Sequence, residues 1–171
     1  MEFRDLKLAV EEALRLLCKH DYVLIRKDAS EWAIAHRLAV YLENIIPNWH
    51  VDCEYNRQGL GNDPKVNQYA EKVRPDIILH HREMVEREHN FVVIEVKKNE
   101  TDEDSDKVKD YTSPPSGKRT FQYQYGLTLS FLPELNCTWF QNGNPVAWVS
   151  CPITLFSSRN ECTVANTTAN E

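Results

Sequence analysis

The sequence predicts an α+β fold, because segments with helical periodicity and segments of strand-like composition follow one another along one chain of 171 residues. Two segments near the N-terminus repeat apolar residues at helical spacing. Several later segments are short, apolar and rich in β-branched or aromatic residues, as strands are. This length suits one domain with a sizeable core. We expect a single domain over residues 1–156 and a polar, disordered tail over residues 157–171.

The first two elements are predicted to be amphipathic helices. The segment 3–19 places apolar residues on one helical face, namely Phe3, Leu6, Val10, Leu14 and Leu17. The short run Tyr22–Ile25 is compatible with a strand or with a buried connection. Ser30 is the expected N-cap of a helix over residues 31–46. The apolar stripe of this second helix consists of Ile34, Leu38, Leu42 and Ile45.

A half-buried strand is predicted over residues 49–55, where apolar and polar residues alternate. Val51, Cys53 and Tyr55 would share one face of this strand. Asp52 and Glu54 would share the other face.

Further strands are predicted at residues 74–79, 91–97 and 121–132. The charged stretch 81–89 would join the first two as a hairpin connection. A short helix is expected over residues 103–111, capped by Asp102 or Ser105. Residues 138–149, with a turn at Gln141–Asn144, predict a terminal hairpin. We expect the helices to pack on one face of this meander.

Two charged residues interrupt one face of the strand 91–97. Because side chains alternate between the faces of a strand, Phe91, Val93, Glu95 and Lys97 share one face. Burying a carboxylate or an ammonium group is costly unless the group is paired or coordinated. A strand that carries both groups two residues apart indicates a function for them.

Asp76 and Glu95 are suited to bind one divalent cation, Mg²⁺ or Mn²⁺, because hard cations prefer carboxylate oxygens. A water molecule on such a cation has a lowered pKa and can attack a phosphodiester. Lys97 would point into the same site and orient the attacking water or stabilise the developing charge. This combination predicts metal-assisted phosphodiester hydrolysis.

The residues Pro75-Asp76 and Glu95-Val96-Lys97 resemble the motif of the PD-(D/E)xK nuclease superfamily. The resemblance covers about residues 30–111. It implies the restriction-endonuclease-like fold, whose α-β-β-β-α-β core is a three-layer-like α/β arrangement. The N-terminal helix and the C-terminal β-hairpin would extend this core. It also implies a metal-dependent nuclease that acts on DNA.

The resemblance further implies a supporting acid on the helix before the first core strand, and Glu31 occupies that place. By analogy Glu31 would be a third metal ligand or would position water. Alternatively, Glu31 only favours the positive end of the helix dipole. Asp76, Glu95 and Lys97 also have an alternative interpretation without a function. Asp76 would cap a turn, and Glu95 and Lys97 would be a solvated ion pair on an edge strand.

The net charge of −6 argues against a tight, general DNA-binding protein, which usually has a basic surface. Two alternatives to the nuclease follow. The chain is a catalytically silent nuclease-fold module for binding or assembly in a defence, repair or mobile-element system, or it is an acidic interaction protein that presents Glu100–Asp106 to a basic partner. Five basic residues could contact phosphates, but each is interpreted as a solvated surface cation: Arg57, Arg74, Lys98, Lys118 and Arg119.

Five scattered cysteines form no CxxC pair, which argues against a disulfide framework or a zinc site and favours a reducing cytoplasm. The histidines His36, His50, His80, His81 and His89 show no spacing typical of metal ligands. No segment is long and apolar enough to predict a membrane span. A homodimer is compatible with a nuclease that cuts both strands of a duplex.

Overall fold

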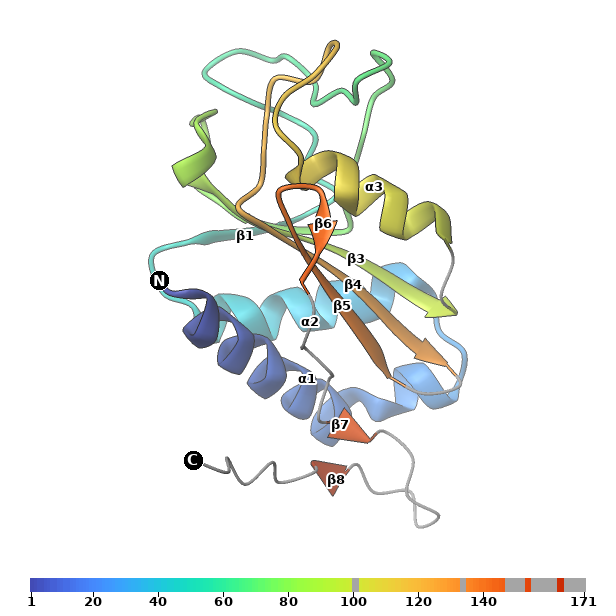
Figure 1. Ribbon diagram of the computed structural model, residues 1–171. Helices are drawn as coiled ribbons and strands as arrows, with labels where there is room; N and C mark the ends of the chain where they lie inside the picture. The colour runs from blue at the N-terminus through green and yellow to red at the C-terminus, as the bar shows by residue number, and fades with distance from the viewer. Residues whose placement is uncertain (100–101, 133–134, 147–152, 155–162, 165–171) are drawn as a thin grey trace.

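The fold is a six-stranded mixed sheet with helices on both faces (Figure 1). The computed structural model describes residues 1–99, 102–132, 135–146, 153–154 and 163–164. Its elements are α1 (Phe3–Arg26), α2 (Glu31–Ile45), β1 (His50–Cys53), β2 (Ile77–His80), the 3-10 helix η1 (Arg87–His89), β3 (Asn90–Asn99), α3 (Asp102–Thr112), β4 (Tyr125–Leu132), β5 (Asn136–Gln141) and β6 (Asn144–Pro145). The strands β7 (Ile153–Thr154) and β8 (Thr163–Val164) pair separately. The rest of the predicted tail, 157–171, lies outside the described residues.

The sheet has the strand order β1-β2-β3-β4-β5-β6, which is the order of the chain. Strands β3 and β4 are parallel, and every other neighbouring pair is antiparallel. Parallel neighbours need a crossover connection, and α3 supplies it between β3 and β4. The elements from α2 to β4 therefore follow the order α-β-β-β-α-β, and the α+β class is confirmed.

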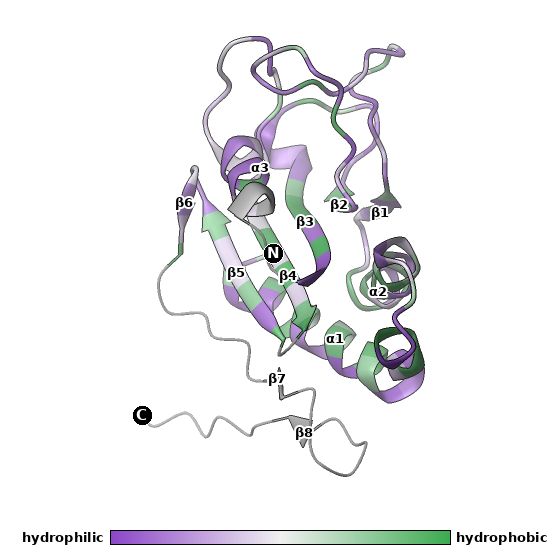
Figure 2. Ribbon diagram, turned by 90° about the vertical axis from the view of Figure 1, so that its right-hand side faces the viewer, coloured by the Kyte–Doolittle hydropathy of each residue, from purple (hydrophilic) through white to green (hydrophobic). Residues whose placement is uncertain are grey.

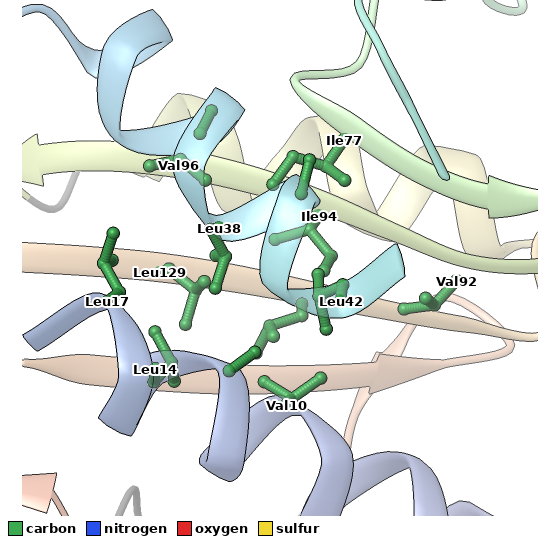
Figure 3. Packing of buried hydrophobic residues seen from close by; sticks show 14 of the residues in the cluster. Val10, Leu14, Leu17, Leu38, Leu42, Ile77, Val92, Ile94, Val96 and Leu129 are labelled. Atoms are coloured by element: carbon green, nitrogen blue, oxygen red, sulfur yellow. The ribbon is translucent and has the colours of Figure 1, made fainter. Parts of the chain in front are cut away.

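Helices cover both faces of the sheet, so the expectation that they pack on one face is wrong. Helices α1 and α2 pack with Ile77, Ile94 and Leu129 in the larger core (Figure 3). On the opposite face, Ile78 and Val93 pack in a smaller cluster with Tyr111, Phe121 and Tyr123, on the side of α3 (Figure 2). Strand β3 is apolar on both faces, because Val93 and Ile94 are both fully buried. Each face of the sheet must therefore be shielded from water by helices or loops that pack on it.

The first helix is longer than predicted. The run Tyr22–Ile25 belongs to the last turns of α1 and is neither a strand nor a loop connection. Its buried member Ile25 continues the apolar face that includes Cys18. Helix α2 begins where predicted, and the Ser30 hydroxyl accepts a hydrogen bond from the Ala33 N–H at 3.3 Å.

Two departures from strict alternation change which face a side chain occupies. Glu54 has a φ of +49°, a left-handed conformation that ends β1. Tyr55 therefore packs against the smaller cluster, whereas Val51 and Cys53 pack against the larger one. Phe91 likewise belongs to the larger core and does not share a face with Val93.

The cause at Phe91 is a register shift of the β2–β3 pairing between Leu79 and His80. The Phe91 ring stacks on Trp49, with ring centroids 4.7 Å apart.

Two later elements differ from the prediction in their bounds. The predicted strand 121–132 begins only at Tyr125. The predicted helix 103–111 is α3, and both predicted caps, Asp102 and Ser105, lie within its first turns.

The predicted hairpin is confirmed for β5 and β6, with Asn142 and Gly143 both at positive φ in the turn. Residues 147–149 of that prediction lie outside the described residues. Within the described part of the chain, none of the helices combines the length and apolar character that crossing a membrane requires.

Candidate active site

Asp76 directly precedes β2 and is held against β3. Its Oδ2 atom accepts a hydrogen bond from the Val96 N–H at 2.8 Å. Ile77 pairs with Ile94, so Asp76 comes one residue before this pair on β2 and Glu95 one residue after it on β3. The register of an antiparallel pair therefore brings the two acids to the same level of the sheet.

Glu95 is almost fully buried, with 4 % of its surface exposed. It alternates with Val93 and therefore belongs to the face of the sheet that α3 covers. Glu95 also lines a cavity of about 550 Å³, together with residues of the loop 54–74 and of α3. A carboxylate in this position is costly to bury without compensating groups. Its access to a cavity makes Glu95 suitable for a cation that enters from solvent.

Lys97 and Glu31 form an ion pair that joins β3 to α2. The Lys97 Nζ atom lies 3.3 Å from Glu31 Oε2, and the Lys98 N–H donates to Glu31 Oε1 at 3.0 Å. Both oxygens of Glu31 are thus engaged with the end of β3. Glu31 lies in the first turn of α2, as predicted, and the structure adds this contact to the two interpretations of its role.

The four predicted site residues therefore gather around residues 95–98 of β3. In the part of the chain that the structure describes, no group of three or more His, Cys, Asp or Glu side chains is arranged to hold a metal ion. Asp76 and Glu95 offer two carboxylates on paired strands, whereas the oxygens of Glu31, the third predicted ligand, contact Lys97 and Lys98. Two carboxylates are sufficient for Mg²⁺, which is commonly held by one or two carboxylates and retains several waters.

A second polar network, which the sequence did not reveal, lies on the neighbouring strands. Asp52 Oδ2 lies 2.9 Å from His80 Nε2, and Arg82 binds both Asp52 oxygens, at 2.8 Å and 2.6 Å. Burial opposes ionisation of Asp52, but these hydrogen bonds outweigh it and hold its pKa below its usual range. Burial lowers the pKa of His80, although its hydrogen bond with Asp52 acts in the opposite direction.

This network accounts for residues that the sequence left open. His80 is 2 % exposed and binds Asp52, whereas Glu54 is exposed. The Nδ1 atoms of His81 and His89 lie 2.9 Å apart, although the sequence showed no spacing that marked them. The pairing of β1 with β2 and of β2 with β3, which only the structure reveals, brings Asp52 to His80 and His81 to His89.

Two buried cations were also missed. Arg119 is 2 % exposed, and its guanidinium donates to the carbonyl oxygens of Ser113, Pro114 and Phe121, so its interpretation as a surface cation is wrong. Lys65 is 1 % exposed and donates to the Arg57 carbonyl at 3.0 Å. Desolvation lowers the pKa of Lys65 to about 8. Both residues lie in stretches of loop composition, where no periodicity indicates burial.

No known family model, curated protein or solved structure matches this chain. The functional assignment therefore depends on the chemistry of the site. The acidic run 100–106 falls partly outside the described residues, and its last member, Asp106, lies on α3 and lines the cavity beside Glu95.

Proposed function

We propose that the chain is a metal-dependent nuclease of the PD-(D/E)xK type that hydrolyses phosphodiester bonds, with DNA as the expected substrate. The observation that carries this proposal is the 2.8 Å hydrogen bond from the Val96 N–H to Asp76 Oδ2. It fixes the acid of the first motif half beside the strand segment that carries Glu95 and Lys97. The motif thus corresponds to a spatial arrangement as well as to a sequence pattern.

The topology supports the same proposal. The order from α2 to β4 is the α-β-β-β-α-β order of the restriction-endonuclease-like core, and α2 and α3 lie on opposite faces of the sheet. The carboxylates of this proposed core stand where β2 begins and where β3 approaches its end. The N-terminal α1 and the β5–β6 hairpin are additions to that core.

In this proposal Asp76 and Glu95 hold Mg²⁺ or Mn²⁺, which when bound supplies Lewis-acid stabilisation and a water of lowered pKa. Lys97 directs its ammonium group to the attacking water and to the negative charge that develops on the phosphoryl oxygens. Glu31 accepts from Lys97 and from the backbone of β3, and so holds the lysine in place.

A substitution of the lysine tests this function. Lys97→Ala removes the ammonium group and is expected to lower the rate of cleavage by about 10²–10³-fold. The matched control is Lys7→Ala, which removes a lysine paired with Glu11 on α1. The proposal fails if Lys97→Ala and Lys7→Ala cut nucleic acid at the same rate.

The second candidate function is a catalytically silent nuclease-fold module for binding or assembly. It is favoured by the lack of a three-ligand metal group among the described residues and by the net charge of −6. Calorimetry with Mn²⁺ separates the two. The nuclease requires one Mn²⁺ site per chain that is lost in Glu95→Ala and kept in the control Glu43→Ala, which changes an exposed acid of α2.

Two further expectations remain predictions. One is a reducing cytoplasm, in which Cys18, Cys53 and Cys137 would stay reduced. Cys151 and Cys162 lie outside the described residues. A homodimer is expected only if the enzyme cuts both strands of a duplex.

A further inference from the structure

The cavity that contains Glu95 is bounded by two walls. The loop 54–74 contributes residues 67–69 and 71–74, and α3 contributes Asp106, Lys107, Asp110 and Tyr111. Its volume of about 550 Å³ lies within the roughly 300–1,000 Å³ that pockets for small ligands span. A single nucleotide fits such a space.

The outer wall is tied to the rest of the molecule. The loop 54–74 folds back on itself, with hydrogen bonds from Lys65 N to Asn56 O and from Val73 N to Lys65 O. It lies beside the loop 113–124 (Figure 1), and Lys118 N donates to Gln68 O at 3.2 Å. The buried Lys65 ammonium anchors the inside of the loop. The wall formed by the loop 54–74 is therefore held in place by the protein's own hydrogen bonds.

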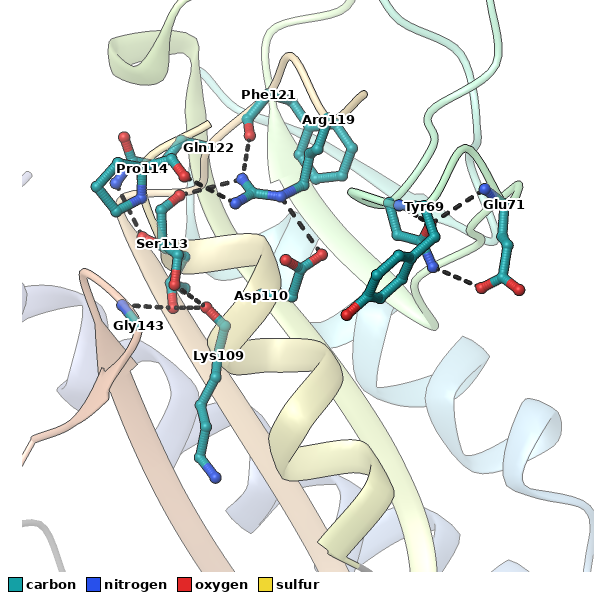
Figure 4. A network of polar contacts seen from close by, with 12 residues as sticks. Tyr69, Glu71, Lys109, Asp110, Ser113, Pro114, Arg119, Phe121, Gln122 and Gly143 are labelled. Carbon is teal, nitrogen blue, oxygen red and sulfur yellow. Dashed lines mark hydrogen bonds and ion pairs between the residues drawn. The ribbon is translucent and has the colours of Figure 1, made fainter. Parts of the chain in front are cut away.

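This wall carries groups that suit an unpaired nucleotide. Tyr69 is a large aromatic residue with 75 % of its surface exposed, and it lies on the part of the loop nearest α3 (Figure 4). Lys72 and Arg74 are exposed and line the same cavity. Neither of them forms a side-chain hydrogen bond or ion pair with the described part of the chain. Bases stack on exposed aromatic rings, and cations hold the phosphates between them.

The acids of the cavity walls are already compensated from other directions. Glu71 accepts from the Asn67 side chain at 2.8 Å, and Asp106 pairs with Lys109. Asp110 lies 3.4 Å from the Arg119 Nε atom (Figure 4). Among the basic residues that line the cavity, Lys72 and Arg74 are the exposed ones, and a strand that enters meets them beside Lys107 and Glu95.

We propose that the cavity binds single-stranded nucleic acid, with a base stacked on Tyr69, the adjoining phosphates on Lys72 and Arg74, and the backbone leading to Glu95. This inference rests on the proposed nuclease function and names its substrate class. It also agrees with the net charge of −6, since a local cavity lined by basic residues needs no extended basic surface.

Fluorescence anisotropy in EDTA tests binding separately from catalysis. The probes are a labelled single-stranded DNA, an RNA of the same sequence and the corresponding DNA duplex. We expect both single strands to bind more tightly than the duplex, and the tighter of the two identifies the natural sugar. Tyr69→Ala is expected to weaken single-strand binding about tenfold, whereas Tyr69→Phe keeps it. Lys72→Ala is expected to reduce the slope of log affinity against log salt by about 0.7.

The matched control is Leu60→Ala, which removes the most exposed apolar side chain of the same loop and does not line the cavity. Duplex binding as tight as single-strand binding, or equal effects of Tyr69→Ala and Leu60→Ala, overturns the inference. Cleavage with Mn²⁺ then separates the two proposals. Cutting of duplex alone overturns the single-strand inference and leaves the nuclease, whereas Tyr69-dependent binding without any cutting supports the inference and removes the nuclease.

Discussion

The Lys97 ammonium lies 3.3 Å from a carboxylate oxygen of Glu31, so that the first turn of α2 is joined to the C-terminal part of β3. The side chains are 24 % and 37 % exposed, and a pair at this level of exposure contributes at most about 1 kcal/mol to stability. In the proposed nuclease, the ion pair would fix the position of Lys97, and Glu31 would act through Lys97 as a positioning residue.

Glu31→Gln tests this role. The amide keeps the shape of the side chain but removes the charge that holds Lys97, so we expect the cleavage rate to fall by about 10–100-fold. Urea unfolding is expected to change by less than about 1 kcal/mol. The control is Asp28→Asn, which breaks the neighbouring ion pair with Lys98. Equal rates for the two variants would remove Glu31 from the site.

Gly126→Ala tests the packing of α3 on the sheet. A Cβ atom at Gly126 would come within 2.3 Å of Val108 Cγ1 and 2.8 Å of Thr112 Cγ2. We expect this overpacking to reduce the free energy of unfolding by about 1–3 kcal/mol. In Gly61→Ala, the control, the nearest atom is Asp63 Oδ2 at 3.5 Å, an ordinary contact. Similar urea midpoints for the two variants would contradict the close approach of α3 to β4.

Lys65 predicts a specific dependence of stability on pH. Its pKa is lowered from 10.5 to about 8 by desolvation in the folded state. Between pH 8 and 10.5 the unfolded chain therefore binds more protons at this residue, and stability rises with pH through that window. Below pH 8 the lysine is charged in both states, and its contribution is constant.

The measurement compares urea unfolding of the wild type and Lys65→Met at pH 7.5 and 9.5. Groups that titrate in both proteins cancel in the difference. We expect the wild type to gain roughly 2 kcal/mol relative to the variant on going to the higher pH. A difference in stability between the two proteins that stays constant with pH would contradict the lowered pKa of Lys65.

Arg119→Met tests the anchor of the loop that follows α3. Three carbonyl oxygens would lose their donor and Asp110 would lose its partner, so we expect a destabilisation of about 2–4 kcal/mol in urea unfolding. Lys118→Met changes the exposed neighbouring cation and should have little effect. If both substitutions cost the same, the buried guanidinium is not a structural anchor.

Local physical rules predicted the parts of the fold where short-range interactions decide the structure. Ser30 caps α2 because its hydroxyl can reach the Ala33 N–H, and the alternation around Glu95 follows from the geometry of a strand. These rules failed at Glu54, where a non-glycine residue adopts positive φ and reverses the faces after β1. Nothing in the alternating residues 49–55 indicates such a break.

Long-range contacts explain why the rest of the site was not predicted. Tyr69, Lys72 and Arg74 line one cavity with Glu95 because the loop 54–74 folds over the face that α3 covers. Arg119 looks like a surface cation in its loop, yet it is buried where that loop meets α3. Such placements depend on tertiary packing, which periodicity and composition do not encode.

The most direct test of the nuclease is cleavage by the purified protein of plasmid, linear duplex, single-stranded DNA and RNA, each with Mn²⁺, Mg²⁺ or EDTA. Asp76→Ala serves as the matched variant, because it removes the carboxylate that is bonded to the Val96 N–H. The proposal predicts cutting that needs the metal, is abolished in Asp76→Ala and is strongest on single strands. Metal-independent cutting, or equal cutting by Asp76→Ala, would contradict it.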